Sequence, residues 1–222
     1  MRYKVILFDL DGTLTDPFLG ISQSVQYALS KMGFEVPALH HLRSFVGPPL
    51  QESFIQMFQM TDLEVRSAIT YYRERYAAQG IYENEVYPGI RQMLKLLIDM
   101  DYVLVIATSK PTLFAERIIA HFELDGYFNR IIGSRLDGGR SNKTEIIRNI
   151  KELYPHVLPT DFIMVGDRMH DIIGAHTAGI DSIAVLYGYG TDAELRHSRP
   201  SFLAKSTDEL SLLFESFSNV KV

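Results

Sequence analysis

The segment "KVILFDLDGTLTD", residues 4–16, decides how the chain is interpreted. Residues 5–8 are four consecutive apolar side chains, two of them β-branched, a pattern typical of a buried β-strand. The run ends in Asp9 and Asp11, two carboxylates separated by one residue. Because a nearby like charge disfavours ionisation, this placement costs stability unless another group offsets it.

The composition indicates a single globular protein that acts on something small. The 222 residues, 46% of them hydrophobic, fit one sizeable domain or one domain with a smaller module. With 27 acidic against 22 basic residues and no run of Lys or Arg, a small substrate is favoured over a nucleic-acid polymer. The absence of cysteine excludes disulfides, thiolate metal sites and the cysteine-based phosphatases.

The apolar runs are too short for a membrane protein. They are about strand length, whereas a membrane helix needs roughly 20 apolar residues. The N-terminal run meets Asp9 instead of continuing as the apolar core of a signal peptide. We therefore expect a soluble cytoplasmic protein without a membrane partner, and the sequence leaves its oligomeric state open.

Apolar runs and helical patterns alternate along most of the chain. Near-continuous apolar runs predict buried strands at residues 5–8, 102–107, 130–133, 162–165 and 182–186. Helical patterns cover residues 89–100, 112–122, 143–153, 169–178 and 206–216. The alternation predicts an α/β domain with a parallel sheet covered on both faces and right-handed crossovers.

One interval does not fit a simple alternation. About ninety residues separate Asp11 from the strand at Tyr102, whereas a whole βαβ unit is commonly about thirty. The intervening sequence carries only helical patterns. We therefore predict a discontinuous core of residues 1–16 and 84–222, with an inserted all-helical cap of residues 17–83.

Polar side chains follow the predicted strands where each strand ends. Asp9 and Asp11 follow the first, Thr108, Ser109 and Lys110 the second, and Asp167 the fourth, with Asp171 four residues later. Because ligands bind at the carboxyl ends of the strands in open α/β sheets, we expect these segments to form one site.

The residue types at these strand ends indicate a metal-dependent site. Three carboxylates without Cys or paired His suit Mg²⁺, which would also relieve the repulsion between Asp9 and Asp11. Gly12 lets the chain turn tightly and bring backbone N–H groups close to an oxyanion.

Lys143 points to an anion near the start of a later helix. The helix begins near Asn142, so Lys143 stands at the positive end of its dipole, where a cation is disfavoured by roughly 0.3–1 kcal/mol. A neighbouring anion would reverse this effect. The alternative is a solvated surface lysine.

Four segments together resemble a known family. "DLDGT" after a strand, "TS" after a second, a lysine opening a later helix and "GDRMHD" (residues 166–171) resemble the four motifs of the haloacid dehalogenase superfamily of phosphotransferases. The resemblance covers the whole chain in the same order. It implies a Rossmann-like parallel core with an inserted helical cap, and a phosphatase that works through an aspartyl phosphate.

The resemblance also implies roles for individual residues. Asp9 would be the nucleophile and a Mg²⁺ ligand, while Asp11 would exchange protons with the leaving group and water and offer its backbone carbonyl to the metal. The phosphoryl group would be held by Thr108, Lys143 and the backbone at Leu10, Gly12 and Ser109. Asp167 would bind the metal directly, with Asp171 as an orienting carboxylate nearby.

Two longer segments resemble one branch of this superfamily. "GSRLDGGRSNK" (133–143) and the sequence from Met164 to Gly190 resemble phosphoglycolate phosphatase-like and 5′-nucleotidase-like enzymes. The Arg of "GDR" and the segment "LDGGRSNK" favour the 5′-nucleotidase-like group. The implied substrate is a small phosphorylated metabolite.

Other functions remain open at this point. A dehalogenase would need neither Asp11 as an acid and base nor a metal, and a sugar phosphomutase would share all the motifs. A phosphorylation-dependent signalling domain would also use acidic residues, a Thr or Ser and a Lys. It would have no need for a helical cap, which serves turnover by excluding water and selecting substrates.

Two weaker signals remain. "GYGTDA" (188–193) fits the dinucleotide pattern G-x-G-x-x-A, but too few residues follow for the rest of that fold, so we expect a turn into a helix. The family resemblance implies that this turn is a loop on the rim of the site. Arg43, ahead of the turn at Gly47-Pro48-Pro49, is a candidate contact for an anionic substrate. Its alternative is again a solvated side chain.

Overall fold

The computed structural model describes residues 2–136, 139 and 142–218. The chain divides into two compact units. The core unit comprises Met1–Thr15 and Val86–Val222, and the inserted unit comprises Asp16–Glu85.

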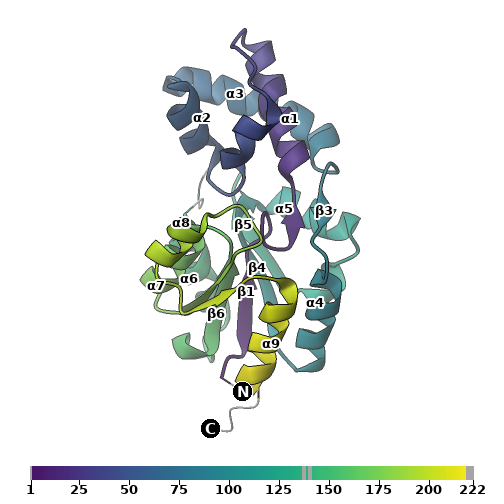
Figure 1. The fold of residues 1–222 in the computed structure, drawn as a ribbon, viewed down its shortest axis with the longest axis vertical. Helices are drawn as coiled ribbons and strands as arrows, with labels where there is room; N and C mark the ends of the chain where they lie inside the picture. Colours follow the sequence, from purple (N-terminus) through teal and green to yellow (C-terminus); the bar gives the residue numbers. More distant parts are fainter. Residues whose placement is uncertain (1, 137–138, 140–141, 219–222) are drawn as a thin grey trace. The chain divides into compact units, whose positions relative to one another are not determined.

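The core unit is built on a six-stranded parallel sheet (Figure 1). Across the sheet the strands are β5 (Arg130–Ser134), β4 (Val103–Pro111), β1 (Val5–Phe8), β6 (Phe162–Gly166), β7 (Asp181–Val185) and β8 (Phe202–Ala204). Each neighbouring pair is parallel. The α/β fold class predicted from the sequence is confirmed.

Strand β1 lies at the centre of the sheet because its neighbours come from opposite halves of the chain. Val5 is in register with Val103 of β4 on one side and with Phe162 of β6 on the other. The strand order therefore reverses beside β1. In open α/β sheets, the carboxyl ends of the strands at such a reversal are where ligands bind.

Helices connect the strands and cover the sheet. Those of the core unit are α4 (Ile90–Asp99), α5 (Thr112–His121), α6 (Lys143–Leu153), α7 (Met169–Thr177), α8 (Asp192–His197) and α9 (Thr207–Ser218), with short 3₁₀ turns at Asp125–Tyr127 and Pro159–Asp161.

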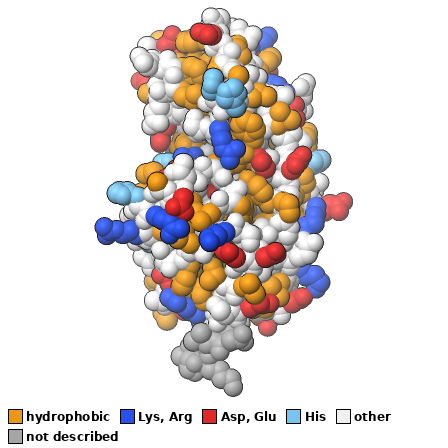
Figure 2. Space-filling model, viewed as in Figure 1, with side chains coloured by type: hydrophobic (Ala, Val, Ile, Leu, Met, Phe, Trp, Pro, Cys, Tyr) orange, Lys and Arg blue, Asp and Glu red, His pale blue; other side chains and the backbone are white. Residues whose placement is uncertain are grey.

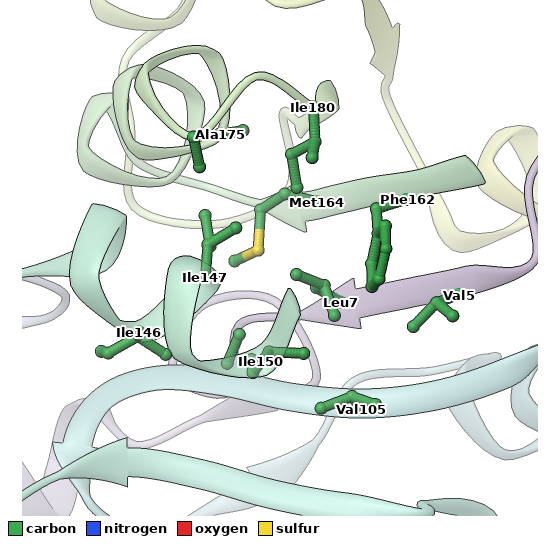
Figure 3. Packing of buried hydrophobic residues seen from close by; sticks show 12 residues of the cluster. Val5, Leu7, Val105, Ile146, Ile147, Ile150, Phe162, Met164, Ala175 and Ile180 are labelled. Atoms are coloured by element: carbon green, nitrogen blue, oxygen red, sulfur yellow. The ribbon is translucent and has the colours of Figure 1, made fainter. Parts of the chain in front are cut away.

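One face of the sheet packs against α6 and α7 (Figure 3). Leu7 and Met164 point from β1 and β6 toward Ile147 of α6. All three side chains are fully buried. Because successive strand residues alternate between faces, a strand apolar at every position needs cover on both faces, as the near-continuous runs predict.

The sheet differs from expectation in two places. It contains a sixth strand, β8, whose three residues are too short to stand out as an apolar run. Strand β4 also continues past Ala107 to Pro111, with a shift of register between these two residues. Thr108, Ser109 and Lys110 therefore lie in an irregular strand end, a feature that redirects side chains and is common beside active sites.

The inserted unit is helical between its ends. It contains α1 (Phe18–Lys31), η1 (Leu39–Phe45), α2 (Leu50–Phe58), α3 (Asp62–Arg75) and the π-helical turn η2 (Tyr76–Gly80). Helix α1 packs against η1, α3 and η2. The segments where the chain leaves and re-enters the core unit, β2 (Thr15–Asp16) and β3 (Glu85–Val86), pair with each other.

The surface carries charges of both signs. On the face shown in Figure 2, acidic and basic side chains of the described residues are interspersed. Such a face offers no continuous basic track for a nucleic-acid backbone. Within the described part of the chain, no helix is long and apolar enough to cross a membrane.

Candidate active site

The segment after β1 forms a tight turn. The backbone N–H groups of Thr13, Leu14 and Thr15 all donate to the carbonyl oxygen of Leu10. Gly12 has φ +82°, a conformation that side-chain-bearing residues rarely adopt. A Cβ atom on Gly12 would lie 2.2 Å from Oδ2 of Asp167, so the turn also needs glycine for its close approach to that carboxylate.

Two backbone groups predicted to hold a phosphoryl group already have protein acceptors. The N–H of Leu10 donates to Oδ1 of Asp9 at 2.8 Å, and the N–H of Gly12 donates to the carbonyl of Thr15 at 2.8 Å. A phosphate oxygen at these positions would have to compete with those acceptors.

Asp9 lies beside Lys143 at the carboxyl end of β1. Oδ1 of Asp9 is 3.1 Å from Nζ of Lys143, and Nζ is also 2.7 Å from Oδ1 of Asp171. The ammonium donates a further hydrogen bond to the carbonyl of Ala107 at 2.9 Å. Lys143 is only 4% exposed, so the alternative of a solvated surface lysine is wrong.

The helix start explains how Lys143 is placed. Asn142 is the N-cap of α6, its side chain accepting a hydrogen bond from the N–H of Thr144, and Lys143 is the first helical residue. Burial alone lowers the pKa of Lys143, but the carboxylates of Asp171 and Asp9 raise it above its ordinary value. Lys143 therefore remains a cation, stabilised by the two anions beside it.

Asp167 is fully buried at the end of β6. Its Oδ1 accepts a hydrogen bond from Oγ1 of Thr13 at 3.2 Å, and its Oδ2 accepts one from the N–H of Tyr189 at 2.8 Å. Burial raises the pKa of Asp167 well above its ordinary value, and the charges of Asp171 and Asp9 raise it further. Burial also raises the pKa of Asp171, while Lys143 opposes that shift.

The three carboxylates form a candidate cation site. Asp9, Asp167 and Asp171 each offer an oxygen, and these oxygens lie within 4.8 Å of one another. Among the described residues, Asp9 and Asp171 form ion pairs with the ammonium of Lys143. When all three carboxylates are ionised, the buried cluster therefore carries more negative than positive charge. Oxygen donors and this charge imbalance fit a hard divalent cation such as Mg²⁺.

Asp11 forms an ion pair with a different lysine. Its Oδ2 is 2.7 Å from Nζ of Lys110, and both side chains are largely buried. Its other oxygen, Oδ1, is buried and has no hydrogen-bond partner among the residues that the structure describes. Burial raises the pKa of Asp11, an effect that Lys110 partly offsets and the charge of Asp9 reinforces.

Lys110 lies in the site, and its role could not be assigned from the strand-end pattern that includes it. It directly follows Thr108 and Ser109, and the position of all three residues at a strand end predicts that they lie at the site. Thr108 is 2% exposed, and its Oγ1 accepts a hydrogen bond from the N–H of Lys110 at 3.2 Å. Thr108 thereby fixes the backbone from which the lysine projects.

The remaining predicted positions fall in three places. Ser109 lies in the irregular end of β4, partly exposed. Arg43 belongs to η1 of the inserted unit, where its side chain is exposed. The motif "LDGGRSNK" lies partly outside the described residues, at positions 137–138 and 140–141.

The arginine of "GDR" also has a partner inside the protein. Nε of Arg168 donates to Oε1 of Glu194 at 2.9 Å, and the same oxygen accepts the N–H of Met169 at 3.0 Å. Glu194 thus ties the start of α7 to α8. This contact gives the arginine a structural role besides any contact with substrate.

The chain is similar to proteins whose names describe phosphatases and a nucleotidase. The chain is 43% identical to a 5′-nucleotidase of Pseudomonas aeruginosa over 97% of both chains, and 26% identical to a phosphoglycolate phosphatase of Vibrio vulnificus over 93% of this chain and 94% of the other. The crystal structure of a predicted phosphatase from Clostridium acetobutylicum superposes with a TM-score of 0.93 at 43% identity, covering 97% of this chain and 100% of that one.

A family model confirms the resemblance seen in the four motifs. The model described as haloacid dehalogenase-like hydrolase matches residues 6–185, which include every strand-end segment of the site. The chain belongs to the haloacid dehalogenase-like hydrolase family.

Proposed function

We propose that this hydrolase is a Mg²⁺-dependent phosphatase that acts on small phosphomonoesters through a phosphorylated Asp9. The observation that carries the proposal is the different surroundings of two carboxylates only two residues apart. Asp9 lies in the cation site with Lys143, Asp167 and Asp171, whereas Asp11 is paired with Lys110. When two titratable groups at one site have different environments, their pKa values differ, and this difference is typical of a pair in which one group is the nucleophile and the other the acid and base.

In the first half-reaction, a carboxylate oxygen of Asp9 attacks phosphorus and the bond from phosphorus to the ester oxygen breaks. The leaving oxygen takes a proton from Asp11, whose Oδ1 is free of other protein partners among the described residues. Lys143 stabilises the negative charge on the transferring phosphoryl group. Such charge stabilisation, together with positioning, supplies most of the catalysis in phosphoryl transfer.

In the second half-reaction, water attacks the phosphorus of the aspartyl phosphate and gives its proton to Asp11. Inorganic phosphate leaves and the carboxylate of Asp9 is regenerated, so atoms and protons balance over the cycle. Mg²⁺, held by Asp9, Asp167 and the backbone carbonyl of Asp11, would supply further positive charge for the phosphoryl oxygens. Asp171, paired with Lys143, orients that ammonium.

The most specific substrate proposal is a nucleoside monophosphate. It rests on the 43% identity to a 5′-nucleotidase and on the "GDR" and "LDGGRSNK" motifs. Phosphoglycolate is the second candidate because of the similarity to a phosphoglycolate phosphatase. We further propose that the inserted unit acts as the cap, with Arg43 as a contact for the anionic substrate.

A phosphate-release assay tests the function and the substrate class together. Nucleoside monophosphates, phosphoglycolate, sugar phosphates and pyrophosphate are compared with Mg²⁺ and with EDTA. A preference above tenfold corresponds to about 1.4 kcal/mol of differential transition-state binding and would identify the class. If the protein releases phosphate from none of these compounds, the phosphatase proposal is rejected.

Product analysis separates a phosphatase from a mutase. A sugar phosphomutase would return an isomerised sugar phosphate from the same intermediate, without net release of phosphate. A stoichiometric, long-lived phosphoprotein with neither product would instead favour a signalling domain.

A further inference from the structure

The loop after β7 contacts Asp167, one of the proposed metal ligands. We call residues Tyr187–Gly190 the 187–190 loop. The N–H of Tyr189 donates to Oδ2 of Asp167 at 2.8 Å, and the N–H of Gly190 donates to the main-chain carbonyl of Asp167 at 3.1 Å. The loop therefore fixes both the side chain and the backbone of Asp167.

Gly188 lets the loop come this close. A Cβ atom at this position would lie 2.4 Å from Cβ of Asp167 and 2.4 Å from the carbonyl oxygen of Gly12. A Cβ atom on Gly12 would lie 2.2 Å from the same carboxylate. Asp167 thus lies between two glycines, neither of which can carry a side chain without displacing it. Gly188, the first glycine of "GYG", allows the backbone to approach the carboxylate of Asp167. In a dinucleotide-binding site, the corresponding glycine would allow the backbone to approach a pyrophosphate.

Tyr187 joins the loop to the turn after β1. Its hydroxyl donates to the carbonyl oxygen of Thr13 at 2.9 Å, and Thr13 in turn donates through Oγ1 to Asp167. The ring packs edge-on against Tyr87 with 5.2 Å between centroids, which holds the phenol in place. Burial and the charge of Asp167 raise the pKa of Tyr187, so the hydroxyl stays a donor at neutral pH.

We propose that the 187–190 loop is the element that positions Asp167 against the turn at residues 9–13 for cation binding, with Tyr187 and Gly188 as positioning residues. The inference rests on the proposed function for the identity of the cation. Mg²⁺ demands near-ideal octahedral geometry, so small displacements of its ligands weaken binding. Groups that orient metal ligands typically change affinity by about 10–100-fold when removed.

Two variants test the loop by calorimetric titration with Mg²⁺ alone, in the absence of substrate. Gly188→Ala inserts a methyl group against Asp167 and is expected to raise the Mg²⁺ dissociation constant by about 100-fold or more. Tyr187→Phe removes one oxygen atom and is expected to raise it about 10-fold. If Gly188→Ala does not fold, Tyr187→Phe decides the question.

Matched controls distinguish positioning from general damage. Gly126→Ala changes an exposed glycine whose added Cβ would meet nothing within 4 Å, and Tyr102→Phe removes a hydroxyl that donates to the carbonyl of Phe214 away from the site. Both should bind Mg²⁺ as the wild type does. In phosphate release, the loop variants should need more Mg²⁺ for half-maximal rate while keeping the substrate KM at saturating Mg²⁺.

The outcomes separate the inference from the proposed function. If the wild type binds Mg²⁺ and both loop variants bind it within about twofold of the wild type, a difference of only about 0.4 kcal/mol, the inference is overturned and the phosphatase proposal stands. If the wild type neither binds Mg²⁺ nor releases phosphate, the proposed function fails and the inference fails with it.

Discussion

Asp9 and Asp11 are two residues apart, yet each is paired with a lysine from a different part of the core unit. Asp9 meets Lys143, at the start of α6, which it shares with Asp171. Asp11 meets Lys110, in the irregular end of β4. Asp9 therefore lies in a cluster with excess negative charge, whereas Asp11 is balanced by its own cation. Because the two residues are of the same type, any difference in their chemistry must come from their surroundings.

The largest effect is expected at Asp9. Asp9→Asn keeps the size of the side chain but removes the nucleophilic carboxylate, so kcat for phosphate release should fall by about 10⁴-fold or more. The assay is Mg²⁺-dependent release from the best ester, with thermal unfolding as the check on folding. A clean preparation that retains more than about one hundredth of the wild-type rate would reject Asp9 as nucleophile.

Lys143→Met removes the shared cation and should affect both activity and stability. We expect kcat to fall by about 10²–10³-fold, because a charge that stabilises the transition state is lost. The free energy of unfolding, measured in denaturant, should fall by about 3–5 kcal/mol, because two buried carboxylates lose their partner.

A double variant separates these two effects. Adding Asp171→Asn to Lys143→Met removes one of the stranded charges, so part of the lost stability should return while the activity stays low. Recovery of activity together with stability would show that Lys143 acts only by holding the fold.

Lys110→Met tests the other half of the comparison. If Lys110 holds the carboxylate that protonates the leaving group, an alkyl phosphate should lose about 10–10²-fold in kcat, and 4-nitrophenyl phosphate should lose much less because its leaving group needs no proton. Lys95→Met is the control, since Lys95 is an exposed lysine paired with Asp99. An equal loss on both esters would remove Lys110 from proton transfer.

Both lysines could be placed near the site from the sequence, but a role could be predicted for only one of them. Lys143 could be found because a helix start is visible in the sequence and a cation there needs an explanation. Lys110 could not be assigned a direction, because the register shift of β4 after Ala107 decides which way the side chains point. A strand predicted to end at residue 107 carries no information about that irregularity.

The same distinction holds for the rest of the molecule. The central strands could be predicted because they are apolar on both faces, whereas β8 is short. Asp167 was visible as a carboxylate after a strand. The support given by Tyr187 and Gly188 was not, because it depends on how closely their loop approaches Asp167 and the distant turn at Gly12 and Thr13.

Removing the metal should make stability depend on pH in a defined direction. Burial raises the folded-state pKa of Asp171 to about 6 from 3.8, and burial also raises that of Asp167. The metal-free folded protein then binds more protons than the unfolded chain above pH 4, so its free energy of unfolding falls as pH rises through about 6, by ~1–3 kcal/mol.

Bound Mg²⁺ favours the ionised forms of Asp167, its proposed ligand, and of the neighbouring Asp171, and should compensate this loss. Thermal unfolding at pH 5, 6 and 7, with EDTA or with Mg²⁺, should show the larger stabilisation by Mg²⁺ at pH 7. Equal stabilisation at pH 5 and 7 would contradict a cation site made of these carboxylates.

Unlike Lys143 and Lys110, Arg43 is exposed. Its substitution is expected to have the smallest effect on activity. Arg43→Ala should raise the substrate KM by about 10-fold or less with kcat nearly unchanged, because an exposed charge is screened by water and salt. Arg66→Ala, another exposed arginine of the inserted unit, is the matched control. If Arg43 contacts the substrate, its effect on KM should shrink as salt is added and that of Arg66 should stay near zero. Equal KM values for the two variants would show that Arg43 does not contact the substrate.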